Sequence, residues 1–404
     1  MMDSPAPPFL ISWNLTKRCN LLCGHCYLDS CELTGPDAVS TEDAYGFLAE
    51  IAGLSPGAML VLTGGEPLLR PDIFDIASRA SSLGLSPVIG TNGTLLTEKT
   101  IEKLIDSGVQ GFGVSLDSLN PQVHDRIRGM GGAWEKTMKG IEALSASGSP
   151  FQLQFTVTRD NREEMARFID FATDIGAKAV NFFFLVCTGR GQKATDLTPQ
   201  EYESALTLIA RKEKEYESRI MVRARCAPHL VRVAGLADPE STLLKGATSG
   251  CIAGRGYLRI SPEGFVTPCP YIPVSPSSPN LKEIPLGEIW EHGSEFAALR
   301  SPAYQGRCYK CEYAESCGGC RARAFASTGD LMAEDPWCLH EPKGKPVKPK
   351  TAPAWSPEAE ERLKNIPAFI RPMIKKGLER YASSKGINTI TPELMAELKS
   401  KAGR

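Results

Sequence analysis

The chain of 404 residues lacks the features that mark membrane, secreted and nucleic-acid-binding proteins. None of its apolar runs approaches the ~20 residues of a transmembrane helix. Its first residues, Met-Met-Asp-Ser-Pro, have neither the charged nor the apolar region of a signal peptide. The formal net charge of −1 gives no broad positive field for nucleic acid. We therefore expect a cytoplasmic protein of roughly two or three domains, with neither a membrane nor a nucleic acid as partner.

Histidine is scarce at five residues, whereas cysteine is abundant at thirteen. Without a signal peptide the thiols are expected to stay reduced, and reduced thiols more often serve metal binding or catalysis than disulfides. Ten cysteines fall in two groups, three from Cys19 to Cys26 and seven from Cys251 to Cys338. The others, Cys31, Cys187 and Cys226, stand alone, and we expect them to be small buried hydrophobic residues.

The first group is the loop Cys19-Asn-Leu-Leu-Cys23-Gly-His-Cys26, a C-x3-C-x2-C spacing. A structural zinc site would normally use two C-x2-C knuckles instead. Three thiolates with one position left open suit an iron–sulfur cube that has one iron free to bind another group. The alternative is three unrelated buried cysteines. A short strand within residues 11–18 is predicted to lead directly into this loop.

From residue 9 to about residue 224, short apolar runs alternate with longer amphipathic runs. The predicted strands cover 58–63, 86–91, 111–116, 151–157 and 179–185, and the predicted helices cover 71–82, 98–107, 133–147 and 162–175. This alternation indicates a parallel sheet of βα units, about six in number, with active groups at the carboxyl ends of the strands. A charged helix over 201–220 and a connecting region over 221–247 follow.

Several predicted strands are followed by small or polar residues. Gly64 and Gly65 allow the backbone to approach a ligand, and Glu66 offers an acceptor for an ammonium group. The segments Thr91-Asn-Gly93 and Ser115-Leu-Asp117 supply hydroxyl, amide and carboxylate groups. For the first of these segments a simple turn is the alternative.

The thiol loop, followed one βα unit later by the Gly-Gly-Glu turn, resembles the radical S-adenosylmethionine (SAM) enzymes. In that family the loop holds a [4Fe-4S] cluster whose fourth iron chelates the amino and carboxylate groups of SAM. The resemblance implies a partial (β/α)6 TIM-type barrel in which Cys19, Cys23 and Cys26 bind the cluster. It assigns no catalytic residue beyond this cluster.

The same resemblance implies which residues contact SAM. His25 stands where the family has an aromatic residue beside the adenine, and the glycine turn contacts the methionine amino group. Arg190 is expected to meet the SAM carboxylate, with a surface ion pair as the alternative. His124 and Arg128 match a segment common in the family but receive no role. The complete set of expected SAM contacts is His25, Gly64, Gly65, Glu66, Thr91, Asn92, Ser115, Asp117 and Arg190.

The second cysteine group supplies seven thiols, enough for two further clusters. A structural zinc ribbon from Cys308 to Cys338 is the alternative for part of it. The order of the cysteines resembles the SPASM extension of radical SAM proteins, which carries auxiliary [4Fe-4S] clusters. The family places three residues between its fifth and sixth cysteines, where this chain has only two. The resemblance implies one cluster on Cys308, Cys311, Cys317 and Cys338, and another on Cys251, Cys269 and Cys320 with one iron open or bound by another group.

The C-terminal segment, residues 341–404, carries fourteen Lys or Arg against seven Asp or Glu. A Pro- and Lys-rich linker is predicted first. Helix-start signals then occur at Ser356-Pro-Glu358 and Thr391-Pro-Glu393, although a solvated tail is the alternative. The segment resembles a helical module of a light-independent protochlorophyllide reductase subunit, which also ends several radical SAM enzymes of haem synthesis. A basic module suits an anionic ligand such as a porphyrin with propionates.

These observations predict four regions: a radical SAM barrel over 9–224, a SPASM domain with its connector over 225–340, a linker over 341–354 and a helical module over 355–404. The segments 266–271, 319–331 and 334–338 resemble the haem branch of SPASM proteins. That branch implies oxidative removal of tetrapyrrole propionates in haem or haem d1 synthesis. Its cofactors would be SAM and two or three [4Fe-4S] clusters, with a ferredoxin- or flavodoxin-type electron donor.

Two other functions fit parts of the sequence. A SPASM peptide maturase is one, but such enzymes commonly begin with a peptide-recognition domain, and this chain begins only about ten residues before its first predicted strand. That short start favours a porphyrin substrate. A non-catalytic cluster scaffold or electron carrier is the other, and it would not turn over SAM.

Overall fold

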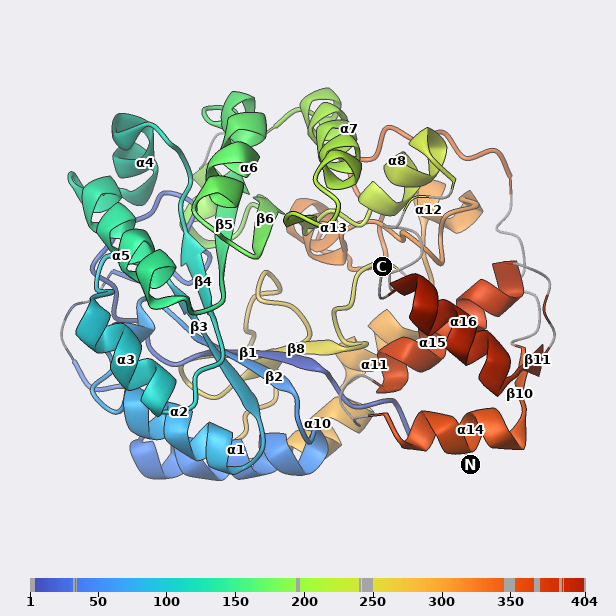
Figure 1. The fold of residues 1–404 in the computed structure, drawn as a ribbon, viewed down its shortest axis with the longest axis horizontal. Coiled ribbons are helices and arrows are strands. Elements are labelled where there is room, and N and C mark those ends of the chain that lie inside the picture. The colour runs from blue at the N-terminus through green and yellow to red at the C-terminus, as the bar shows by residue number, and fades with distance from the viewer. Residues whose placement is uncertain are drawn as a thin grey trace.

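The computed structural model describes residues 4–31, 33, 35–193, 197–239, 241, 250–344, 353–366, 371–384, 387 and 389–402. Its central feature is a nine-stranded sheet covered by helices on one side, followed by a cysteine-rich region and a small C-terminal module (Figure 1). Within the described part of the chain, no helix combines the length and the apolar character needed to cross a bilayer.

Seven parallel strands follow one another across the sheet in chain order. They are β1 (Leu10–Asn14), β2 (Met59–Thr63), β3 (Ser86–Thr91), β4 (Phe112–Ser115), β5 (Phe151–Val157), β6 (Ala179–Phe184) and β7 (Met221–Arg225). Because the strands are parallel, the loops that follow them gather at one edge of the sheet. The predicted partial TIM-type barrel is confirmed. The expectation that 221–247 is only a connection was wrong, because β7 pairs with β6 there.

Helices cover the outer side of these strands (Figure 1). They are α1 (Thr41–Leu54), α2 (Ile73–Ser82), α3 (Glu98–Asp106), α4 (Pro121–Arg128), α5 (Ala133–Ser147), α6 (Met165–Asp174), α7 (Pro199–Glu215) and α8 (Leu230–Ala237). Short polar residues fix where several of them begin. Ser40 forms a capping box with Asp43 at the start of α1, and Thr198 forms one with Glu201 at the start of α7.

The two faces of the sheet have opposite character, as β5 shows. Leu153 and Phe155 are buried toward the helices, where Phe155 packs edge-on against Phe168 with ring centroids 4.7 Å apart. The alternate residues Gln152 and Gln154 point to the other face and are only partly buried. Closed TIM barrels fill their interior with branched apolar side chains. The polar inner face of this open sheet is instead suited to holding a ligand.

The second half of the chain extends the sheet beyond β1. Strand β8 (Tyr257–Ile260) pairs in parallel with β1, and β9 (Val266–Thr267) pairs antiparallel with β8. Short helices follow: α10 (Leu286–His292), α11 (Ser294–Arg300), α12 (Gly306–Lys310) and α13 (Arg321–Thr328). The first thiol loop and the second cysteine group are therefore joined by one continuous sheet.

The C-terminal module has a hydrophobic core of its own. Its elements are β10 (Ala354–Trp355), α14 (Pro357–Lys364), α15 (Arg371–Ser384), β11 (Thr389–Ile390) and α16 (Pro392–Ala402). Leu363, Leu378 and Ile390 are buried together in it. The predicted helix start is present, since Ser356 Oγ accepts a hydrogen bond from the Ala359 backbone N–H at 3.2 Å. The sequence also predicts a break in the helix that starts at Pro357, at Pro367 or Pro372; Pro367 lies outside the described residues, and Pro372 lies near the start of α15.

Gly65→Ala is expected to destabilise the protein by about 1–3 kcal/mol. A Cβ at Gly65 would lie 2.2 Å from the Arg18 carbonyl oxygen, and the backbone there cannot move freely. It is held by hydrogen bonds of 2.8 Å from Gly65 N to Thr16 O and from Glu66 N to Arg18 O. Anaerobic urea unfolding measures the change. Gly53→Ala in α1 is the control, because a Cβ there meets nothing within 4 Å, and an equal loss in both variants would contradict the prediction.

Candidate functional site

The loop after β1 brings its three cysteines together. Cys19 and Cys23 are buried, Cys26 is partly buried, and the three pack with Leu21 and Ala133. Burial, together with the charges of the two neighbouring thiols, raises the pKa of Cys19 to about 12. Such thiols become good ligands only when a metal's positive charge favours the thiolate. Three soft sulfur donors in one buried loop fit an iron–sulfur cluster with one iron left open.

Glu66 ties the ends of β2 and β3 together. Its carboxylate is fully buried and accepts hydrogen bonds from Thr91 Oγ1 at 2.8 Å, Asn92 N at 2.8 Å and Leu68 N at 3.2 Å. Burial raises the pKa of this carboxyl to about 7. Asn92 Nδ2 in turn donates to Asn20 Oδ1 in the thiol loop at 2.9 Å. The expected SAM contacts at the ends of β2 and β3 are thus hydrogen-bonded to one another and to the thiol loop.

Arg128, at the end of α4, links the thiol loop to the end of β4. Its Nη2 lies 2.8 Å from Asp117 Oδ2, and its Nη1 donates to Cys23 Sγ at 3.8 Å. Burial alone would raise the pKa of Asp117, but the charge of Arg128 outweighs it and the pKa is lowered. We gave Arg128 no role from the sequence. Its family-like segment was the available signal, but only the fold shows which thiol it reaches.

His25 is part of the thiol loop, and Arg190, in the segment after β6, contacts the same loop. His25 Nε2 is 3.8 Å from Asp117 Oδ2, and burial lowers the pKa of His25 to about 4, so its ring is neutral near pH 7. Arg190 donates from Nε to Cys23 O at 3.0 Å and from Nη2 to Ser30 O at 2.9 Å. The side chain of Arg190 therefore braces the loop, and its predicted contact with the SAM carboxylate stays a prediction. Arg190 Nη1 also lies 3.6 Å from Asp29 Oδ1 and forms an ion pair with it. Ser115, another of the expected SAM contacts, is the last residue of β4.

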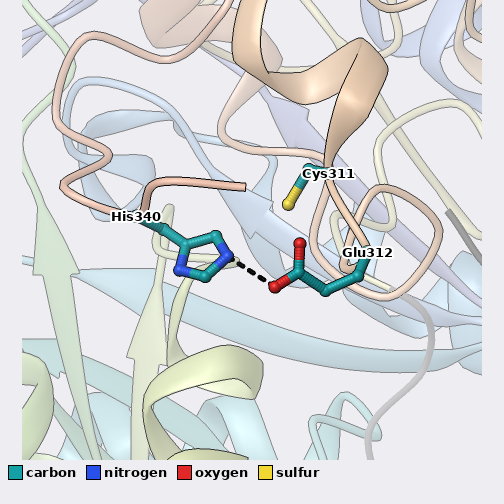
Figure 2. Close-up of side chains that lie close together, drawn as sticks. All are labelled: Cys311, Glu312 and His340. Atoms are coloured by element: carbon teal, nitrogen blue, oxygen red, sulfur yellow. Dashed lines mark hydrogen bonds and ion pairs between the residues drawn. The ribbon is translucent and has the colours of Figure 1, made fainter. Parts of the chain in front are cut away.

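The four cysteines predicted for one auxiliary cluster line a single cavity. Cys308, Cys311, Cys317 and Cys338 surround it. Figure 2 shows Cys311 beside Glu312 and His340, whose possible ligand atoms lie within 4.8 Å of one another. His340 Nε2 and Glu312 Oε1 are 2.9 Å apart and bond to each other. We therefore regard this pair as flanking the Cys311 thiol rather than as part of a separate metal site.

The remaining three predicted ligands, Cys251, Cys269 and Cys320, also pack together. They do so with Cys226, which directly follows β7. Cys226 is thus partly buried among apolar residues, but it also has other thiols as neighbours, whereas the expectation that Cys31 is buried was wrong because Cys31 is exposed. The distance of Cys226 in sequence from the other thiols gave no signal of this neighbourhood.

Comparisons with known proteins agree with this arrangement. Residues 13–172 match the Radical SAM superfamily, residues 251–321 match the SPASM iron–sulfur cluster-binding domain, and residues 355–399 match the proto-chlorophyllide reductase 57 kD subunit. The chain therefore belongs to the radical SAM superfamily, in the group whose members also carry a SPASM domain.

Among its relatives, the chain is 41% identical over 347 residues to the AdoMet-dependent heme synthase of Methanosarcina barkeri, covering 84% of this chain and 98% of that protein. It is 30% identical over 350 residues to the Fe-coproporphyrin III synthase of the same organism, covering 81% and 87%. The crystal structure of Streptococcus suis SuiB bound to S-adenosylmethionine shares the fold with a TM-score of 0.68, at 19% identity over 83% of this chain and 78% of that one.

Arg128→Gln is expected to lower the free energy of unfolding by about 3–5 kcal/mol, because it leaves the buried Asp117 carboxylate without its cation. Arg126→Gln, two residues earlier on α4, removes an exposed pair with Asp160 and should cost at most about 1 kcal/mol. Urea unfolding of both variants and of the wild type measures the difference. Similar losses of unfolding free energy in the two variants would show that the buried Arg128–Asp117 pair contributes no more to stability than an exposed pair.

Glu66→Gln is expected to flatten the dependence of stability on pH. Because burial raises the carboxyl pKa from 4.5 to about 7, the folded state binds more protons than the unfolded chain in this window. The stability that this proton uptake contributes is present in full below pH 4.5 and is lost as pH rises through about 7. Urea unfolding of SAM-free protein from about pH 5 to about pH 8 tests this. The exposed Glu163→Gln is the control, and an unchanged slope in Glu66→Gln would refute the assignment.

Proposed function

We propose that this radical SAM enzyme removes propionate side chains oxidatively from an iron tetrapyrrole. The chain resembles the AdoMet-dependent heme synthase of Methanosarcina barkeri over 98% of that protein's length, and this supports a tetrapyrrole as the substrate class. The structural observation that carries the proposal is a cation on the inner face of the sheet, Arg225, at the carboxyl end of β7.

Arg225 has the surroundings of a residue that binds an anion. Its Nε donates to Asn181 Oδ1 at 2.7 Å, and its side chain is still exposed to solvent. Although solvent reaches part of the side chain, the protein atoms packed around the guanidinium and the nearby charge of Arg223 lower the pKa of Arg225. Arg223 has Glu213 as partner at 3.4 Å, whereas no Asp or Glu of the described residues forms an ion pair with Arg225. A substrate carboxylate would supply the missing negative charge and bind a guanidinium well.

The proposed site lies at the carboxyl end of β7, beside the second cysteine group. Cys19, Cys23 and Cys26 would hold the cluster that binds SAM, and SAM would supply the 5′-deoxyadenosyl radical that takes a hydrogen atom from the substrate. Each propionate that becomes a vinyl group loses that hydrogen atom, carbon dioxide and one electron, so an electron acceptor is needed nearby. Arg225 is adjacent in sequence to Cys226, which packs with the thiols of the second group. A carboxylate on Arg225 would therefore lie next to the iron–sulfur domain.

Further parts of the chain are consistent with this role. The C-terminal module is basic, as a protein that binds an anionic porphyrin would be. Arg128 and Arg190 hold the thiol loop through Cys23, which keeps the cluster loop in place during turnover. We further propose a cytoplasmic location and a ferredoxin- or flavodoxin-type protein as the reductant.

The direct test is an anaerobic reaction of reconstituted enzyme with dithionite, SAM and Fe-coproporphyrin III. We expect 5′-deoxyadenosine together with porphyrins that have lost carbon dioxide and two hydrogens per side chain, detected by mass spectrometry. Formation of 5′-deoxyadenosine with neither porphyrin conversion nor a Soret shift would leave the radical chemistry but refute the substrate. A peptide maturase would give that result.

Arg225→Ala is expected to weaken porphyrin binding roughly ten- to a hundredfold, the effect of losing one charged hydrogen-bonded pair of about 1.5–3 kcal/mol. Soret titration measures the dissociation constant. Arg211→Ala, on the exposed surface of α7, is the control and should bind as the wild type does. Equal porphyrin affinity of the wild type, Arg225→Ala and Arg211→Ala would show that Arg225 does not bind the substrate.

A further inference from the structure

Four thiols from four segments of the chain meet between the barrel and the cysteine-rich region. Cys226 follows β7, Cys251 precedes β8, Cys269 follows β9, and Cys320 immediately precedes α13. They pack in one cluster with Ile272, Leu299 and other apolar residues. None of the four forms a disulfide. The family pattern supplied only three of them, so the fourth position of this site was left open.

The backbone at Cys226 is held in an unusual conformation. Its φ is +58°, in the left-handed region that L-residues with a Cβ avoid at a cost of about 1–2 kcal/mol. Among the described residues that are not glycine, only Asp29 and Ser218 share a positive φ. Ala227, the next residue, is buried, so Cys226 is not part of a loosely packed loop. Strain of this kind persists where the surrounding structure fixes a residue for a purpose.

One buried ion pair fixes the backbone at two of the four thiols. Arg323 Nη1 lies 3.0 Å from Asp335 Oδ2, and both side chains are almost fully buried. Arg323 Nη2 donates to Cys226 O at 2.9 Å, while Asp335 Oδ2 accepts a hydrogen bond from Cys320 N at 2.7 Å. The separation of Cys226 from Cys320 is therefore set by a short chain of charged hydrogen bonds, not by sequence proximity.

The chemistry around Cys226 favours a thiolate bound to a metal. The Tyr271 hydroxyl, two residues beyond Cys269, donates to the Cys226 sulfur. Four cysteine ligands are the usual set for a [4Fe-4S] cluster.

We propose that Cys226 is the fourth ligand of the auxiliary cluster on Cys251, Cys269 and Cys320. All four irons of that cluster are then bound to cysteine, which leaves no iron free for substrate. The cluster would pass electrons but would not bind the porphyrin. A carboxylate of the porphyrin would bind the neighbouring Arg225 instead. The ligand assignment rests on the iron–sulfur domain and not on the substrate, so either proposal can fail alone.

The test uses the full-length chain in which Cys19, Cys23 and Cys26 are changed to alanine, so that no open iron of the SAM site contributes. We expect about eight irons per chain, the content of two cubes. Addition of ¹³C-cyanide to the dithionite-reduced protein should give no ¹³C hyperfine coupling by electron–nuclear double resonance. Cyanide bound to an auxiliary cluster in this protein would overturn the proposal, and this measurement involves no change at Cys226.

Adding Cys226→Ala to the same protein should either create a ¹³C-cyanide coupling or remove about four irons, with the far-UV circular dichroism unchanged. Cys226→Ser, which keeps an oxygen ligand, should retain more iron than Cys226→Ala and shift the g-values of one cluster. Cys31→Ala, which removes an exposed thiol, is the matched control and should change nothing. Iron content and spectra of Cys226→Ala that equal those of Cys31→Ala would refute the ligand assignment. If Cys226→Ala does not fold, the cyanide result on its parent protein decides.

Discussion

The structure depends on one constraint, the parallel pairing of β1 to β7 in chain order. Because all seven strands point the same way, every loop that carries chemistry leaves the same edge of the sheet. This pairing places the thiol loop, the Gly64–Glu66 turn, Asp117 and Arg225 along the same edge, although they span more than half of the chain. Strand β8 also runs toward this edge, and the antiparallel strand β9 then leads the chain back away from it to Cys269 of the second cysteine group.

Buried charges hold the converging loops in fixed positions. Asp117 with Arg128 fixes the first thiol loop, and Asp335 with Arg323 fixes the second cysteine group. Each cation also reaches a cysteine, Arg128 through the sulfur of Cys23 and Arg323 through the carbonyl of Cys226. Buried ion pairs add little net stability compared with apolar packing, but breaking one is costly. Their value here is positional, because a cluster site tolerates little movement of its ligands.

The sequence predicted what depends on local spacing. The thiol loop, the Gly-Gly-Glu turn and most strands and helices lie where the periodicity placed them, since each is defined within a few residues. It missed what tertiary packing decides. Strand β7 has only five residues, and two of them are Arg223 and Arg225. It therefore lacks the apolar run by which the other strands were predicted. Cys226 and Arg225 acquire their neighbours only when β7 pairs with β6, and no spacing rule links them to Cys251 or Cys320.

The contact between Tyr27 and Tyr271, with ring centroids 5.3 Å apart, has a consequence for how this architecture evolves. Tyr27 follows Cys26 of the first loop, and Tyr271 lies within the second cysteine group, two residues after Cys269. Together with the pairing of β1 and β8, it makes the barrel and the iron–sulfur domain one packed unit. These two parts are not interchangeable modules. A chimera that exchanged one of them between relatives would have to preserve the strand register and this aromatic contact, whereas the C-terminal module, with its separate core, is free of that requirement.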